Sequence, residues 1–560
     1  MSDYRSGAII RTSRPLDQEL LRDYTCPGMS TRKTVTKAAG IMTAAILLSR
    51  VLGLVRESVI AGVFGQNRPT DIYNAAFALP DVLFFLIAGG ALSSAFIPVF
   101  TELFKAGKER EAWKTFSVIA TVMGLVVGAF ILVTEIFARQ LVPVLSAPGF
   151  SHSELDRVAA LTRIVLPSQF FFFIGGLMMG TLYSRGHFVS PGLGPSIYNI
   201  GIMSGALILG HRLGIAGLCW GALCGAFAGN FLLQLITMSR LGASYRPSLD
   251  FRDPGAIKVW KLMVPVIFGL SLPQIDVWIN RWLATFLSAG IATALVRGNQ
   301  LMQVPVGVFG QSTAIAFFPT LSDQAAQGEQ DEFKNTLNYG LRLILFAAIP
   351  SSVLLGVLAK PIVILLFQHG RFSQADTTVV SLTLMFYSIG IAGWCMQAMV
   401  ARAFYAMQDT FTPVWTGTLM TLIFIPAKWA VVHYGGDALY WGMALGTSLS
   451  ATTHVLLLLF IARKRLHGIH GKLLLSSASK VAAASAALGV VAYLVSFNIS
   501  TIPALSIAGG KGQALGIVVL SSLLGGLAFL AVVKLLKVEE ASAAWGMMKE
   551  RFSRGGREAA

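Results

Sequence analysis

The sequence predicts an all-α polytopic membrane protein with about fourteen transmembrane helices. Hydrophobic residues make up 54% of its 560 residues, charged residues make up only 13%, and the mean hydropathy is +0.67. Apolar runs of about 20 residues, long enough for a helix to cross a bilayer, recur along the chain. Lysines and arginines gather in every second connecting segment, which is typical of a chain that crosses a membrane repeatedly.

The predicted spans follow one another through short connections. They cover approximately residues 38–63, 72–104, 115–137, 160–184, 188–210, 213–239, 262–287, 291–320, 341–366, 379–405, 412–433, 438–462, 474–496 and 513–536. Segments after even-numbered spans carry about twice as many basic residues as segments after odd-numbered spans, so we expect both termini in the cytoplasm. The net charge of +17 follows largely from this bias and suits anionic lipid, so no nucleic-acid partner is expected.

An internal repeat divides the first twelve spans into two halves. Tyr183 and Pro191 recur as Tyr405 and Pro413, in each case 222 positions later, and further segments recur at offsets of 221 to 224. Each half has six spans, an even number, so the two halves share one orientation and are related by a pseudo-two-fold axis along the membrane normal. Repeats of this kind place a substrate site between two lobes.

The repeat and the composition together predict five segments. They are a disordered cytoplasmic tail at 1–36, a first lobe of six helices at 37–240, a second lobe of six helices at 241–465, an additional helix pair at 466–537, and a cytoplasmic tail at 538–560. The first segment contains no apolar stretch long enough for a signal peptide.

Charged residues interrupt the first two spans at Arg50, Arg56, Glu57, Asp71 and Asp81. A charge at membrane depth costs about 2.5–3.5 kcal/mol on insertion scales, so it is expected to face a wet cavity or a partner. Arginines suit the bidentate capture of phosphate or carboxylate oxygens. The alternative is that both arginines extend from a helix end to the membrane surface. Apolar sequence on both sides of Arg56 favours the cavity.

Polar residues also interrupt the seventh and eighth spans. They are Gln274, Asp276, Asn280 and Arg281 in the seventh, and Arg297, Asn299, Gln300 and Gln303 in the eighth. Their helical spacing allows both sets to line one cavity. An internal network that fixes the helices, with an ion pair between Asp276 and Arg297, fits the spacing equally well.

Motifs for catalysis and for metal binding are missing from the sequence. It contains no HExxH, no paired cysteine and histidine spacing, no Walker loop and no GxSxG. A membrane glycosyltransferase would need an acidic catalytic pair near a cytoplasmic loop, and none is evident. We therefore expect a transporter without an enzymatic activity, a resident cofactor or a metal site.

Several sequence segments, in their order along the chain, resemble the MurJ/MviN lipid II flippase family. They are SRVLGLVRE, TDIYNAAFALP, GGALSSAFIPVFTE, LLFQHGRFSQADT and ARAFYAMQDTFTPV. The likeness extends over the first twelve spans, and the additional helix pair also fits this family, which belongs to the multidrug/oligosaccharidyl-lipid/polysaccharide exporter superfamily.

The resemblance implies a function in peptidoglycan biosynthesis and cell shape. Family members move lipid II, the undecaprenyl-pyrophosphate-linked peptidoglycan precursor, across the bacterial inner membrane by alternating access. The implied partners are this precursor, membrane lipids and the cell-wall synthesis machinery. By motif, Arg50, Arg56 and Asp71 match charged positions on which the family relies, and Glu57 stands where an acidic residue is usual.

The chain departs from the family at several cavity positions. Phe84 and Phe85 stand where relatives often have one or two arginines, and the pair Asn299 and Gln300 stands where they often end in arginine. Arg297 lies one turn before Gln300, and we expect it to replace one of the missing cations. The predicted substrate-binding residues are therefore Arg50, Arg56, Glu57, Asp71, Arg297, Asn299 and Gln300.

The driving force is a second point of departure. Asn280 stands where some relatives have an aspartate that is linked to a sodium site, so Asp276 and Asn280 are the candidate ion site. The membrane potential or a monovalent cation is the expected driver. Two alternative substrates remain open from the sequence, another lipid-linked oligosaccharide or small molecules of the kind that multidrug exporters carry. A small-molecule exporter would favour acidic cavity residues and twelve spans.

Overall fold

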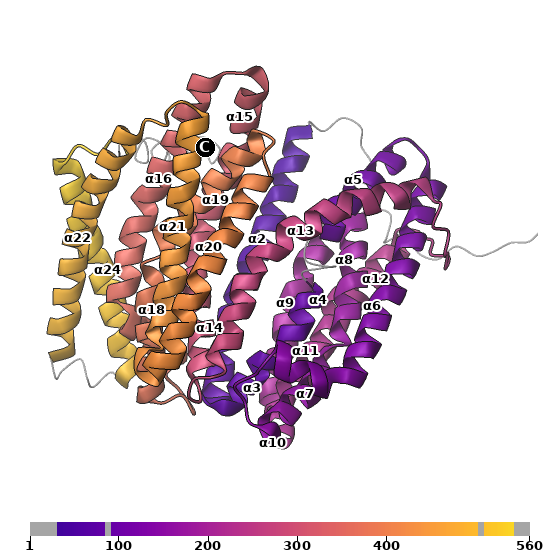
Figure 1. The fold of residues 1–560 in the computed structure, drawn as a ribbon, viewed down its shortest axis with the longest axis horizontal. Helices are drawn as coiled ribbons and strands as arrows, with labels where there is room; N and C mark the ends of the chain where they lie inside the picture. Colours follow the sequence, from indigo (N-terminus) through magenta and orange to yellow (C-terminus); the bar gives the residue numbers. More distant parts are fainter. Residues whose placement is uncertain (1–30, 85–90, 502–508, 542–560) are drawn as a thin grey trace, which may run out of the picture.

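The computed structural model describes residues 31–84, 91–501 and 509–541, and this part of the chain is helical without any strand (Figure 1). The predicted all-α membrane fold is confirmed. The first half contains α2 (Thr31–Phe64), α3 (Arg68–Ala76), α4 (Ala78–Leu83), α5 (Ala91–Lys105), α6 (Glu109–Leu145), α7 (His152–Val165), α8 (Ser168–Ser184), α9 (Val189–Ser204), η2 (Gly205–Leu209), α10 (Gly210–Leu213), α11 (Ala216–Gly225), η3 (Ala226–Leu232) and α12 (Leu233–Arg240).

The second half and the C-terminal pair follow the same helical pattern. They contain α13 (Pro254–Ala284), α14 (Ile291–Pro305), η4 (Val306–Gln311), α15 (Ser312–Gln327), α16 (Gln330–Val357), α17 (Ala359–Phe367), α18 (Gln374–Ser388), α19 (Ile391–Ala406), α20 (Phe411–Ala430), η5 (Val431–Gly435), η6 (Gly436–Leu439), α21 (Trp441–Arg465), α22 (Gly471–Thr501) and α24 (Gly509–Leu535). The elements η2 to η5 are π-helical, and η6 is a 3₁₀ turn.

Ten helices of the described residues are long and apolar enough to cross a membrane, or eleven if α18 and α19, which meet at a 44° bend, form one span. Helix also occupies the other predicted spans, in α2, in α3 to α5 and in α13. The number fourteen remains a prediction. Because α2 begins at Thr31, residues 31–36 are helical and do not belong to the disordered tail that the sequence predicts. The rest of that tail, and residues 542–560, lie outside the described residues.

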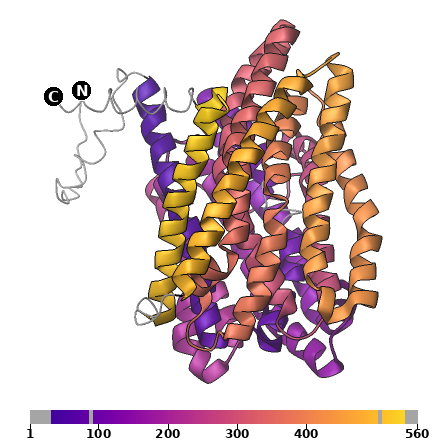
Figure 2. The ribbon, with the colours of Figure 1, turned by 90° about the vertical axis from the view of Figure 1, so that its left-hand side faces the viewer.

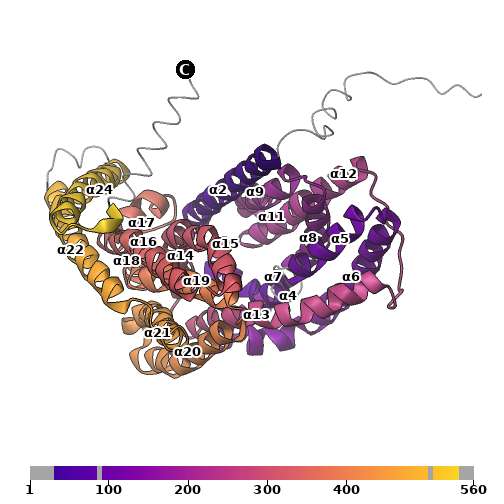
Figure 3. The same cartoon turned by 90° about the horizontal axis from the view of Figure 1, so that it is seen from above.

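The helices form two groups side by side (Figure 1), here called the first lobe (α2–α12) and the second lobe (α13–α21). Figure 3 shows α2 and α13 between the two groups, on opposite sides. Helix α2 packs mainly on α9 of its own lobe, whereas α13 packs on α5 and α6 of the first lobe as well as on α20. Each lobe has a buried apolar cluster of its own. Two further clusters join the lobes, one through Ala61 of α2 and one through Ala256 and Val259 of α13.

The C-terminal pair α22 and α24 lies on the outer side of the second lobe (Figure 2). The two helices pack on each other, and they also contact α16 and α17. Val481, Leu488 and Phe529 form part of a buried cluster with Phe346 of α16. Arg342 of α16 adds ion pairs with Glu539 and Glu540 after the end of α24, the first at 2.7 Å.

Residues 241–253, which connect the two lobes, are held along α6. This segment ends at Asp253, which accepts hydrogen bonds from the Thr115 hydroxyl at 2.8 Å and from the Ala256 amide at 2.9 Å. Asp253 therefore caps α13 and fixes its start against the first lobe. Lys114 donates to Asp250 at 2.7 Å, and this contact holds the pKa of Asp250 below its ordinary value.

Glycines bring α9 and α11 into backbone contact. Gly217, Gly221, Gly225 and Gly229 recur every fourth residue on the sixth span, a spacing that favours close helix packing. A Cβ atom added at Gly221 would lie 2.9 Å from the Cα of Gly205 and would overlap the carbonyl oxygen of Gly201. Only glycine fits there without a shift of the two helices.

Substitution of Gly221 tests this contact. We expect Gly221→Val to lower the melting temperature of the purified protein, because forcing extra volume into a packed interface costs about 1–3 kcal/mol. The matched control is Gly176→Val, since a Cβ at Gly176 meets no atom within 4 Å. Equal melting temperatures for the two variants would mean that α9 and α11 can separate without cost.

Candidate functional site

The polar residues of α13 and α14 meet in a cavity. Asn280, Arg281, Asn299, Gln300 and Gln303 line a space of about 190 Å³, together with apolar side chains of the same helices. Two of the residues predicted to bind substrate, Asn299 and Gln300, therefore border the cavity. Amide groups of this kind can donate hydrogen bonds to phosphate or sugar oxygens.

Arg56 of α2 lies at the centre of a polar cluster that joins both lobes. Its guanidinium donates to Asn199 of α9 at 3.0 Å and to Glu57 at 2.8 Å. The same Glu57 oxygen accepts a longer hydrogen bond of 3.4 Å from Gln300 of α14. The structure thus brings together three of the predicted site residues, and it adds Asn199, which sequence reasoning missed.

Arg50 lies six residues before Arg56 on the same helix and is exposed. Its guanidinium rests on the backbone of η4 in the second lobe, because a Cβ added at Gly307 would overlap it. Within the described residues no carboxylate lies within ion-pair distance of Arg50. It is therefore a cation that a ligand could engage without displacing an acidic partner.

Arg281 of α13 forms an ion pair with Asp81 of α4, with 2.6 Å between the guanidinium nitrogen and the carboxylate oxygen. The pair connects the two lobes, and both side chains keep about a third of their surface exposed, at 30% and 33%. Sequence reasoning left Arg281 and Asp81 out of the predicted substrate-binding residues.

Asp71 does not border the cavity. It is 1% exposed and accepts hydrogen bonds from the Gly290 amide at 2.6 Å, the Thr293 amide at 2.9 Å and the Thr293 hydroxyl at 2.7 Å. Gly290 precedes the first residue of α14, so Asp71 of the first lobe caps the N-terminus of a helix of the second lobe. A carboxylate there satisfies free amides and complements the helix dipole.

Arg297 is also directed away from the cavity, which corrects the prediction that it replaces a missing cavity cation. Its side chain is fully buried, and it donates to Gln66 at 3.1 Å and to the Gly65 carbonyl at 3.2 Å. The rings of Phe367 and Phe372 lie within 5.7 Å and 5.4 Å of its guanidinium. Arg297 and Gln300 are separated by about 60° around α14. This angle is large enough for Arg297 to be buried against the first lobe while Gln300 faces the cavity.

Asp71 and Arg297 belong to a set of contacts that closes one end of the space between the lobes. The Arg371 amide donates a hydrogen bond to the Gly62 carbonyl at 2.8 Å. Asn74 donates to the Thr293 hydroxyl at 3.1 Å, and the Trp278 indole donates to the Leu145 carbonyl at 2.8 Å. All of them lie at or near loops that follow odd-numbered spans. The distribution of basic residues predicts that these loops lie on the side of the membrane opposite the cytoplasm.

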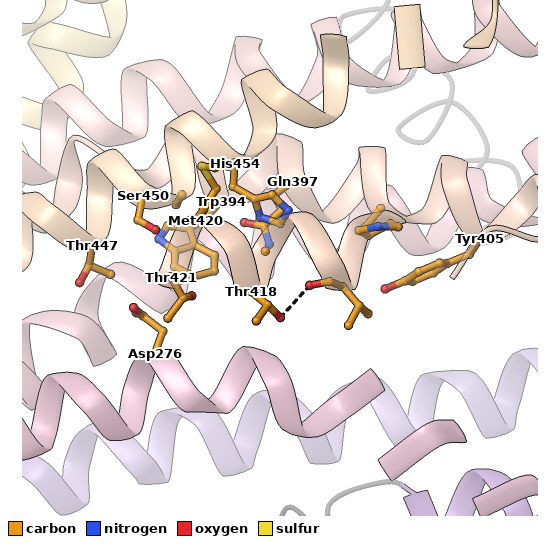
Figure 4. A pocket seen from close by; sticks show the side chains of 15 residues that line it. Asp276, Trp394, Gln397, Tyr405, Thr418, Met420, Thr421, Thr447, Ser450 and His454 are labelled. Carbon is orange, nitrogen blue, oxygen red and sulfur yellow. Dashed lines mark hydrogen bonds between the residues drawn. The ribbon is translucent and has the colours of Figure 1, made fainter. Parts of the chain in front are cut away.

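The candidate ion site lies inside the second lobe. Asp276 faces a cavity of about 110 Å³, shown in Figure 4, in which Thr421, Thr447 and His454 also appear. The Lys428 ammonium contacts one oxygen of Asp276 at 2.7 Å, and Asn280 donates to the other at 3.0 Å. The ion pair that the sequence suggested between Asp276 and Arg297 is replaced by this one.

Lys428 was missed because its position near the end of a predicted span favours the membrane surface, whereas its side chain is only 1% exposed. Its ammonium supplies a positive charge where a bound cation would otherwise neutralise Asp276. Over the described ranges, no group of three or more histidines, cysteines and carboxylates could hold a metal ion.

Comparison with known proteins gives one consistent result. A family model described as "Lipid II flippase MurJ" matches residues 60–508. A protein of Vibrio cholerae named "Probable lipid II flippase MurJ" is 30% identical over 436 residues, which cover 76% of this chain and 82% of the relative. The "Lipid II flippase MurJ" of Burkholderia cenocepacia is 30% identical over 427 residues, which cover 75% of this chain and 82% of the relative.

Solved structures agree with the sequence relatives. The chain is similar to "Lipid II flippase MurJ, inward closed conformation", with a TM-score of 0.74, 26% identity, and coverage of 88% of this chain and 98% of the other. It shares its fold with a multidrug resistance MATE family transporter of the MOP superfamily, with a TM-score of 0.61, 13% identity, and coverage of 75% and 94%.

The cap that Asp71 provides can be tested by accessibility. Because loss of a helix cap costs about 0.5–2 kcal/mol, we expect Asp71→Ala to favour opening of the closed end. A cysteine introduced at Leu287, which is 3% exposed, should then react several-fold faster with an impermeant maleimide. Asp156→Ala is the control, since this exposed carboxylate forms an ion pair with Arg139 at the same end. Equal rates in the two variants would contradict a role of Asp71 in closure.

Proposed function

Because the chain belongs to the lipid II flippase MurJ family, we propose that it moves lipid II across the bacterial inner membrane through the space between its lobes. The observation that carries this proposal is the presence of arginines at and beside the cavity: Arg281 lines it, and Arg56 is connected to Gln300 of its lining through Glu57. A pyrophosphate that leaves water for a low-dielectric site needs cations to replace its hydration. Guanidinium groups provide that replacement in a bidentate geometry.

The proposed cycle begins with the conformation described here. The end of the cavity with Asp71 and Arg297 is closed, so the headgroup would enter from the opposite, cytoplasmic end. Arg50 and Arg56 would engage the pyrophosphate, and the amides of Asn299 and Gln300 would contribute hydrogen bonds from the second lobe. Release on the other side then requires the contacts of Asp71 and Arg297 to break while the cytoplasmic end closes.

We propose that both termini lie in the cytoplasm, and the distribution of basic residues supports this orientation. Membrane lipids and the cell-wall synthesis machinery are proposed partners, and no step of the cycle requires catalysis by the protein. Another lipid-linked oligosaccharide or a small molecule is a less favoured substrate, since both sequence relatives described above are named lipid II flippases.

We propose that the membrane potential drives flipping without a bound sodium ion. The support is the contact of Lys428 with Asp276, because an ammonium tethered 2.7 Å from the carboxylate makes an external cation unnecessary for charge balance. The lysine thus takes the place of the monovalent cation that the sequence left as an alternative.

Substitution of Arg56 tests the proposed function. Loss of a charge-assisted contact to phosphate costs about 1.5–3 kcal/mol, so Arg56→Ala should lower lipid II flipping about tenfold to a hundredfold. Arg56→Lys should restore only part of it, because an ammonium lacks the two-pronged geometry. The measurement is rescue of cells depleted of their own flippase, at matched protein levels, with Arg139→Ala as the control for an exposed arginine. Full rescue by Arg56→Ala would exclude a role in substrate binding.

Removal of sodium tests the proposed driving force. In proteoliposomes, replacing sodium by potassium should leave flipping by the wild-type protein unchanged. In Lys428→Ala the unpaired Asp276 costs about 3–5 kcal/mol, which should lower the melting temperature, and sodium should recover part of the loss. The double variant Lys428→Met with Asp276→Asn should not respond to sodium. A wild-type protein that stops flipping without sodium would refute the proposal.

A further inference from the structure

Two contacts tie the lobes together across the cavity, and the internal repeat relates one to the other. Glu57 of α2 accepts from Gln300 of α14, and Arg281 of α13 pairs with Asp81 of α4. Arg281 follows Glu57 by 224 positions, and Gln300 follows Asp81 by 219, close to the repeat offset. In each lobe the first span therefore reaches the second span of the other lobe. The signal for Arg281 was present in the repeat, at the counterpart of Glu57.

The Arg281–Asp81 pair differs from the ties at the closed end in its access to water. Asp71 and Arg297 are almost fully buried, whereas Arg281 and Asp81 are each about a third exposed. An ion pair that water reaches contributes little net stability, so another anion can compete for its cation. Phosphate oxygens match the same bidentate geometry that the carboxylate uses.

The second lobe has few other positively charged groups that could bind an anionic headgroup at this cavity. Arg297 is occupied in a dry contact, and Gln300 is neutral. On the first-lobe side, Phe84 follows α4, and its ring packs on Phe172 at 5.5 Å between centroids. Among the described residues that line this cavity, Arg281 is the one cation that α13 and α14 contribute from the second lobe.

We propose that the Asp81 carboxylate occupies the position on Arg281 that the pyrophosphate of the substrate takes when it binds. When lipid II enters, its phosphate displaces Asp81, Arg281 becomes a substrate ligand, and the tie between α4 and α13 is released. Binding of the substrate in the cavity is thereby coupled to the release of a contact that restrains movement of the two lobes relative to each other. This inference rests on the proposed function, because it assumes that a pyrophosphate enters the cavity.

Binding of lipid II to the purified full-length protein in nanodiscs of neutral phospholipid tests the proposal. Arg281→Gln should weaken binding about tenfold to a hundredfold, in keeping with the loss of one charge-assisted contact. Asp81→Asn should tighten binding several-fold, because it removes the competing carboxylate. The double variant should bind as weakly as Arg281→Gln alone. Asp81→Glu, which keeps the carboxylate, should bind like the wild-type protein.

The outcomes separate this proposal from the alternatives. If the ion pair only fastens the lobes, Arg281→Gln and Asp81→Asn will shift binding in the same direction and by similar factors, and the proposal is wrong. If the wild-type protein binds lipid II and Arg281→Gln binds it equally well, this inference fails while the proposed function stands. If the wild-type protein itself binds no lipid II, the proposed function fails. Arg139→Gln serves as the matched control, and melting temperatures identify variants that lose their fold.

Discussion

A charge inside a membrane protein requires a partner, and this requirement accounts for most of the polar architecture described above. The ion pairs at and near the two cavities include Arg56 with Glu57, Arg281 with Asp81, and Lys428 with Asp276. Asp71 and Arg297 have instead a helix terminus and neutral oxygens as their main partners. Glu57 lies on the same helix as Arg56, but the partners of Arg281, Lys428, Asp71 and Arg297 come from elements distant in the sequence. Satisfying these charges therefore also determines which helices contact one another, and the apolar clusters pack around those contacts.

The partners fall into two environments with different consequences. At the closed end Asp71 and Arg297 are buried, so removal of one partner would leave a buried polar group without a hydrogen bond, and the end stays closed until several contacts break together. The Arg281–Asp81 pair at the cavity is reached by water, so its partners can be exchanged for those of a ligand. The same chemistry of guanidinium and carboxylate therefore serves as a fixed closure in one place and as an adjustable binding surface in another.

Sequence patterns were sufficient for the fold class and the family, because hydropathy and motif order are properties of the chain itself. They also placed Arg56, Glu57 and Gln300 near one another. They failed for Arg297, because helical spacing gives the angle between two side chains without saying which neighbour each one meets. They failed for Lys428 because proximity to the end of a span suggested the membrane surface. Both errors concern tertiary contacts between helices that are more than a hundred positions apart.

Among the described residues, the additional helices α22 and α24 pack mainly on α16 and α17 of the second lobe, and ion pairs of Arg342 secure them there. The second lobe therefore presents a wider cross-section to the bilayer than the first. In a viscous medium the larger body turns less when two bodies rotate against each other. The second lobe should act as a stator, so that most of the rocking during a transport cycle, as seen from the surrounding lipid, is carried out by the first lobe.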